Sequence, residues 1–159
     1  DALARWKSTR QSLAEFPRKS STEILSRDAI IDCACEIWIP AARPDVVNGA
    51  NIDRLKTKLV LQGANIPFTD EAERSAHARG VLIVPDFIAN AGGVICAAME
   101  YHGATQKAAF DAIGERIREN TEAVLRDARD RGILPRVAAT ELAVRRVRDA
   151  MRIRRHTVM

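Results

Sequence analysis

Three short apolar runs, separated by segments with helical or turn patterns, most constrain how this chain can fold. The runs lie at 36–39, 58–62 and 81–85, and Pro40 ends the first while Gly63 follows the second. Strands that are apolar throughout and alternate with helices are typical of a parallel sheet covered on both faces. We therefore predict an α/β fold with about three parallel strands, followed by C-terminal helices.

The helices of this prediction come from capping and spacing signals. Thr69 or Asp70 caps a helix that runs to Arg79, and Gly80 is its stop signal. Three more helices are predicted: one over 1–12, a short one that begins at the capping-box spacing of 20–23, and one that begins at Gly92. Beyond these, the inward stripe of the C-terminal helices is predicted to be Phe110, Ile113, Ile117, Val124, Ala128, Leu142, Val147 and Met151, with a break at Gly132 and Pro135.

Size and composition exclude several classes of protein. The chain has 159 residues, 47% apolar and 29% charged, which suits one domain or part of a larger one and argues against intrinsic disorder. The longest apolar uncharged run, 87–99, is shorter than the roughly 20 residues that a membrane span needs. Three cysteines, Cys33, Cys35 and Cys96, suit reduced thiols in a cytoplasmic protein better than a disulfide framework or a zinc site.

The net charge of +4 is concentrated near the C-terminus. Arginines in this segment could contact phosphates, or they could form a solvated helix face that complements the helix dipole. No aromatic side chain is interleaved to stack on bases, so we expect no nucleic-acid partner. A noncatalytic binding or assembly module built on this segment is kept as the alternative function. Its arginines are Arg145, Arg146, Arg148, Arg152, Arg154 and Arg155.

Small residues and amide side chains follow each predicted strand. The three segments are 40–42, 62–65 and 85–93, and ligands of open parallel sheets bind at the carboxyl ends of strands. Asn65 and Asn90 each offer a donor and an acceptor, which suits ribose hydroxyls or a carboxamide. The alternative is that these loops are only tight turns that need Gly and Asn.

Two further polar residues near these loops have open interpretations. Asp86 could be a carboxylate of the site, or it could cap and orient the loop that carries Asn90. His102 follows the helix that starts at Gly92, and a surface position is the favoured interpretation for it.

The order of these loops, PAA, then QGAN, then VPDFIANAGGV, resembles the C-terminal part of the glutamate/leucine/phenylalanine/valine dehydrogenase family. The resemblance extends from about Trp6 to Arg152. It implies an enzyme with a substrate domain and a Rossmann domain that oxidatively deaminates an L-amino acid to a 2-oxo acid and ammonia, using NAD or NADP. Residues 1–159 would then be a single partial Rossmann domain, without its first half and without the substrate domain.

The resemblance also implies roles for individual residues. Ala41 and Ala42 resemble the loop under the ribose and adenine side of the coenzyme. Asn65 resembles the residue that bonds the nicotinamide ribose, with Gly63 and Ala64 giving the ribose access to it.

The substrate side of the resemblance is carried by three residues. Asn90 resembles the asparagine at the junction of nicotinamide and substrate, so it is expected to contact both. Val94 matches an apolar position that lines the side chain of the amino acid. Ala97 stands where many glutamate-specific members have a serine, which puts glutamate specificity in question. A glutamate dehydrogenase-like activity is nevertheless the expectation.

Two elements of the family pattern are not found in this sequence. No strand is followed by G-x-G-x-x-G, and the catalytic Lys and Asp of the family belong to the substrate domain. We therefore expect the chain alone to be catalytically inactive. The strand at 36–39 would lack its usual neighbour, and an unpaired apolar edge strand favours association, so a homo-oligomer is expected.

Overall fold

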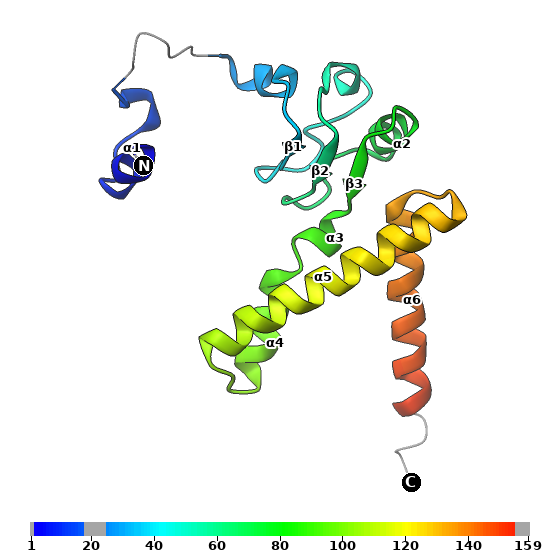
Figure 1. Cartoon of the computed structure of the whole chain (residues 1–159). Coiled ribbons are helices and arrows are strands. Elements are labelled where there is room, and N and C mark those ends of the chain that lie inside the picture. Colours follow the sequence, from blue (N-terminus) through cyan, green and yellow to red (C-terminus); the bar gives the residue numbers. More distant parts are fainter. Residues whose placement is uncertain (1, 18–24, 155–159) are drawn as a thin grey trace. The chain divides into compact units, whose positions relative to one another are not determined.

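The computed structural model describes residues 2–17 and 25–154 (Figure 1). The chain divides into two compact units, 1–30 and 31–159, and each is described by itself. The predicted capping box at 20–23 lies outside the described residues. The first unit contains α1 (Ala2–Ser8) and the 3-10 turn η1 (Leu13–Glu15), and a further 3-10 turn, η2, covers Arg27–Asp32.

A local aromatic contact organises the first unit. The rings of Trp6 and Phe16 meet edge to face, with centroids 5.7 Å apart. The indole nitrogen of Trp6 also donates a hydrogen bond to the carbonyl of Ser12, at 3.0 Å. The helix is therefore shorter than the predicted 1–12, because the chain turns back at Arg10, whose φ is +59°.

A three-stranded parallel sheet forms the second unit's framework. Its strands are β1 (Ile37–Trp38), β2 (Leu59–Leu61) and β3 (Leu82–Val84), in the order β1-β2-β3. This confirms the predicted α/β fold with three parallel strands and C-terminal helices. β1 pairs with β2 and occupies one edge of this sheet among the described residues.

Side chains of the strands alternate between two cores, as the pleat requires. Val60 and Ile83 point into the first core, against α2 and the 3-10 turn η3. Val84 lies in the second core, where Leu59 and Leu61 pack against it. The bounds of the elements that build these cores, in chain order, are η3 (Ile52–Arg54), α2 (Asp70–Ala78), α3 (Asp86–Ala89), α4 (Gly92–Tyr101), α5 (Gln106–Arg131) and α6 (Pro135–Arg154).

The caps of the helices follow the sequence signals. The Thr69 hydroxyl accepts a hydrogen bond from the backbone N–H of Ala72 and starts α2, as predicted. Gly132 ends α5 in the left-handed conformation, with φ +63°. The segment 86–93, expected to be a loop leading to a helix, includes the four-residue helix α3 before α4 begins at Gly92.

Part of the predicted inward stripe is wrong. Val124 and Ala128 are buried in the second core as expected, but Phe110 is 64% exposed. On α6, Val147 and Met151 are 59% and 53% exposed. Helical periodicity identifies an apolar face, but burial also needs a neighbouring element, and no part of the described chain covers these three side chains.

Candidate functional site

The loops after β1 and β2 lie against each other at the carboxyl end of the sheet. The backbone N–H of Ala64 donates to the carbonyl oxygen of Pro40, at 2.8 Å. A Cβ atom on Gly63 would lie 3.1 Å from the Cβ of Ala41 and 3.3 Å from the Cγ2 of Ile39. A side chain on residue 63 would therefore have to displace the neighbouring loop, and glycine leaves a surface of small residues where the two loops approach.

The two predicted amide side chains meet at this end of the sheet. The Nδ2 of Asn90, at the end of α3, donates to the Oδ1 of Asn65, at 2.8 Å. The same nitrogen lies 3.5 Å from the carbonyl oxygen of Gly63. Within the described chain, the Nδ2 of Asn65 and the Oδ1 of Asn90 make no protein hydrogen bond. The pair thus offers an NH2 donor group and a carbonyl acceptor to a ligand.

Asp86 holds the loop that carries Asn65. It is 6% exposed, and its Oδ2 accepts a hydrogen bond from the backbone N–H of Ile66, at 2.9 Å. Its Oδ1 accepts one from Nη1 of Arg136, at 3.0 Å. Because both oxygens are occupied by protein donors, this geometry favours the orienting interpretation of Asp86. The loop it orients most directly is that of Asn65 rather than that of Asn90.

A half-buried guanidinium connects this carboxylate to two other polar side chains. Arg136 donates through Nε to Glu73 Oε2 and through Nη2 to Gln62 Oε1, both at 2.7 Å. Glu73 and Gln62 are 3% and 0% exposed. Burial lowers the pKa of Arg136, but the hydrogen bond and charge of Glu73, together with those of Asp86, outweigh it, so the net pKa is raised.

Of this cluster, the sequence singled out Asp86 and the loop that begins at Gln62, but not Arg136 or Glu73. One signal could have found part of it. Arg136 is the second residue of α6, where the positive end of the helix dipole disfavours a cation. An arginine at that position therefore suggests buried acidic partners elsewhere in the fold. Those partners, Glu73 and Asp86, are 63 and 50 residues away in sequence.

The remaining predicted site residues are exposed side chains of the loop after β1 and of α4. Ala41 and Ala42 are exposed in the loop after β1. Val94 is 78% exposed, and Ala97 is also exposed, one turn further along α4. His102 is exposed and its ring meets that of Tyr101 edge to face.

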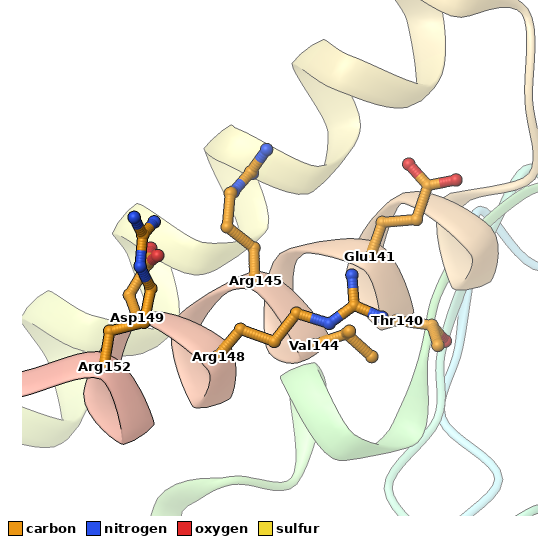
Figure 2. Close-up of a pocket in the computed structure, with 7 residues that line it drawn as sticks. All are labelled: Thr140, Glu141, Val144, Arg145, Arg148, Asp149 and Arg152. Atoms are coloured by element: carbon orange, nitrogen blue, oxygen red, sulfur yellow. The ribbon is translucent and has the colours of Figure 1, made fainter. Parts of the chain in front are cut away.

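The described residues contain no group of three or more His, Cys, Asp or Glu side chains that could hold a metal ion. None of the helices in the described ranges is both long and apolar enough to cross a membrane. A hollow on α6 is lined by arginines interleaved with acidic residues, all from that helix (Figure 2). It contains three arginines of the alternative binding module and none of the predicted coenzyme or substrate residues. It is lined by Thr140, Glu141, Val144, Arg145, Arg148, Asp149 and Arg152.

Comparison with known proteins decides the family. The family model described as Glutamate/Leucine/Phenylalanine/Valine dehydrogenase matches residues 1–155. The chain belongs to this family. As a member of the glutamate/leucine/phenylalanine/valine dehydrogenases, it is 35% identical over 141 residues to glutamate dehydrogenase of Aeropyrum pernix, which covers 82% of the chain and 34% of the relative. It is 37% identical over 93 residues to the NADP-specific glutamate dehydrogenase of Saccharolobus shibatae, covering 57% of the chain and 21% of the relative.

Solved structures agree with the fold of this chain. L-tryptophan dehydrogenase from Nostoc punctiforme matches with a TM-score of 0.70 at 25% identity, over 78% of the chain and 38% of that structure. The hetero-hexameric glutamate dehydrogenase from Thermus thermophilus matches with a TM-score of 0.75 at 23% identity, over 96% and 36%. The chain spans about a third or less of the length of the curated relatives that it matches.

Proposed function

We propose that this chain forms part of the coenzyme site, and part of the substrate wall, of an NAD(P)-dependent L-amino acid dehydrogenase. Such an enzyme oxidatively deaminates an amino acid to a 2-oxo acid and ammonia. The observation that carries the proposal is the Asn65–Asn90 amide pair, held 2.8 Å apart beside small-residue loops at the carboxyl end of a parallel sheet.

The residues at this edge suit a nicotinamide nucleotide. Because a Cβ on Gly63 would press against Ala41, the residues on this surface are small. A ribose can therefore approach the backbone closely. The unused donor of Asn65 suits a ribose hydroxyl, and the unused acceptor of Asn90 suits the carboxamide. Ala41, Ala42 and Ala64 would line the nucleotide side. When bound, the coenzyme supplies a hydride acceptor.

The substrate wall in this proposal is apolar. Val94 and Ala97 lie on one exposed face of α4, three residues apart, so their side chains are neighbours. Asn90 precedes that helix and would contact both coenzyme and amino acid. Glutamate is the substrate class proposed first, since several relatives are named glutamate dehydrogenases. An alanine at 97 provides no hydroxyl for a distal carboxylate, so leucine and phenylalanine belong in the same test.

Coenzyme binding is the direct test of the amide pair. NADH and NADPH are titrated separately into the 15N-labelled chain, and the side-chain amide resonances of Asn65 and Asn90 are followed. Both resonances should shift with at least one of the two coenzymes. N65A and N90A should bind that coenzyme at least tenfold more weakly than the wild type does. N120A, in the middle of α5, is the matched control and should bind as the wild type does. No shift at millimolar coenzyme would refute the proposal.

Turnover is the second test. The chain alone is proposed to be inactive, because none of its residues matches the family's catalytic Lys and Asp. Deamination of glutamate, leucine and phenylalanine is followed by absorbance at the reduced-nicotinamide band, with NAD and with NADP. Turnover well above a chain-free blank would contradict this part of the proposal.

A homo-oligomer in the cytoplasm completes the proposal, with residues 1–159 as one partial nucleotide-binding domain. Its support is β1, a sheet-edge strand among the described residues, with Ile37 and Ile39 53% and 57% exposed. Sedimentation velocity should detect a dimer or larger species at micromolar concentration, and a monomer at all concentrations would contradict it.

A further inference from the structure

We propose that Arg136 is a positioning residue, which holds the Asn65–Asn90 amide pair in its geometry from helix α6. This inference rests on the proposed function for the purpose of the pair, but its structural part can be tested without coenzyme. Arg136 makes no hydrogen bond to either amide, so it would act through the two residues that it binds at the strand ends.

The first step is the set of hydrogen bonds by which Arg136 links the ends of β2 and β3. The planar guanidinium donates to Gln62, the residue after β2, at 2.7 Å, and to Asp86, two residues after β3, at 3.0 Å. The backbone N–H of Asp86 also donates to Gln62 Oε1, at 3.1 Å. A third N–H, from Nε, is fixed by Glu73 on α2. Arginine can make these bonds together because its donors form a rigid fork.

The second step leads from Asp86 to Asn65. The other oxygen of Asp86 accepts from the N–H of Ile66, at 2.9 Å. Ile66 has φ +48°, a left-handed conformation that is unfavourable for a β-branched residue. Its carbonyl accepts from the N–H of Asp45, at 2.9 Å. Hydrogen bonds on both sides thus maintain this conformation, and Asn65 is the residue immediately before it.

The third step leads from Gln62 and Asp86, the residues that Arg136 binds, to Asn90. The carbonyl of Gly63, which follows Gln62, lies 3.5 Å from Asn90 Nδ2. The backbone N–H of Asn90 donates to the carbonyl of Asp86, at 2.7 Å. Asn65 is therefore next to a residue that the Asp86 carboxylate fixes. Asn90 contacts the residue after Gln62 and the backbone of Asp86, and Arg136 binds both Gln62 and Asp86.

Loss of the guanidinium should change the geometry of the amide pair as well as lower the stability of the fold. Without Arg136, the Asp86 carboxylate would lose a charge-assisted hydrogen bond and would remain buried beside Glu73, another carboxylate. Rotation of Asp86 toward solvent would release the N–H of Ile66, and the strained backbone there could relax. The direction of Asn65, and with it the 2.8 Å amide contact, would then change.

The experiment compares the 15N-labelled chain with R136K and R136Q, first without coenzyme. R136Q should shift the side-chain amide resonances of Asn65 and Asn90 and weaken NADH binding at least tenfold. R136K keeps the charge but not the fork, so it should give intermediate shifts and an intermediate loss. If R136Q does not fold, R136K alone decides, by the same resonances.

Two controls separate positioning from general stability. R131Q removes a guanidinium that binds Asp127 and Glu141 on the exposed sides of α5 and α6. G132A strains the left-handed end of α5, with φ +63°, and lowers stability without touching the cluster. Neither should move the two amide resonances.

The outcomes for the two proposals are distinct. Unchanged Asn65 and Asn90 resonances in folded R136Q or R136K, or equal shifts in G132A, would overturn the positioning role. Shifts in the Arg136 variants, with no NADH binding by the wild-type chain, would support positioning and refute the proposed function.

Discussion

Gly63→Ala is expected to destabilise the chain, although its backbone is not in the left-handed region. The new Cβ would stand 3.1 Å from the Cβ of Ala41 and 3.3 Å from the Cγ2 of Ile39. The 2.8 Å hydrogen bond between Ala64 and Pro40 ties the two loops together, so Ala41 can yield little. The substitution therefore inserts a methyl group into a contact that is already full.

The magnitude follows from two opposing effects. Overpacking costs roughly 1–3 kcal/mol, whereas replacing glycine stabilises by about 0.4–1 kcal/mol, because it restricts the unfolded chain. The net expectation is a loss of about 1 kcal/mol in the free energy of unfolding. Gly114→Ala is the matched control, since its Cβ meets nothing within 4 Å in the middle of α5. It should gain about 0.5–1 kcal/mol.

Urea unfolding followed by circular dichroism measures both variants. The midpoint should fall for G63A and rise for G114A, with unchanged slopes. NADH binding by G63A should also weaken, because the methyl group narrows the approach to Asn65. A G63A midpoint equal to or above that of the wild type would show that the two loops separate freely, and the close-approach argument would be wrong.

Two further predictions concern a cap and an ion pair. Thr69→Ala removes the hydroxyl that accepts a hydrogen bond from Ala72 at the start of α2 and should lower the free energy of unfolding in urea by about 1 kcal/mol. Thr105→Ala removes the more exposed cap of α5 and should cost less, because water can replace an exposed hydrogen bond more easily. A larger loss for Thr105→Ala than for Thr69→Ala would contradict this reasoning. The hydrogen bond from Arg131 lowers the pKa of Glu141 below its ordinary 4.5, so the pair stabilises the fold above that pH and loses this contribution as pH falls through the lowered value. In R131Q, NMR titration should find that the pKa of Glu141 is higher than in the wild type. The pKa of Asp32, which the hydrogen bond from Arg54 lowers, is the control and should stay unchanged. An unchanged pKa of Glu141 would show that Arg131 is not the cause of its lowering.

Local signals in the sequence predicted the framework of the second unit. Apolar runs at 36–39, 58–62 and 81–85 contain the three observed strands. The cap at Thr69 and the stop at Gly132 are also as the sequence indicates, because capping needs only neighbours within a few residues. The strand at 36–39 is shorter in the structure, where only Ile37 and Trp38 pair with β2.

The sequence also placed Asn65 and Asn90 at strand ends, and a parallel sheet brings such ends to one edge. That reasoning could predict that the amides are near each other. It could not predict their 2.8 Å hydrogen bond, since this depends on the path of two loops. The exposure of Val147 and Met151 was missed for a related reason: a pattern identifies an apolar face and not the element that covers it.

The sequence by itself determined the three strands, their parallel arrangement, the start of α2 and the edge at which the candidate site lies, because hydrophobic period and caps act over short distances. Only the tertiary structure decided that Arg136 joins Gln62, Glu73 and Asp86 behind that edge. These three partners are 50 to 74 residues from Arg136 in sequence. A buried charge selects its partners by position in the folded chain, and no local pattern encodes that position.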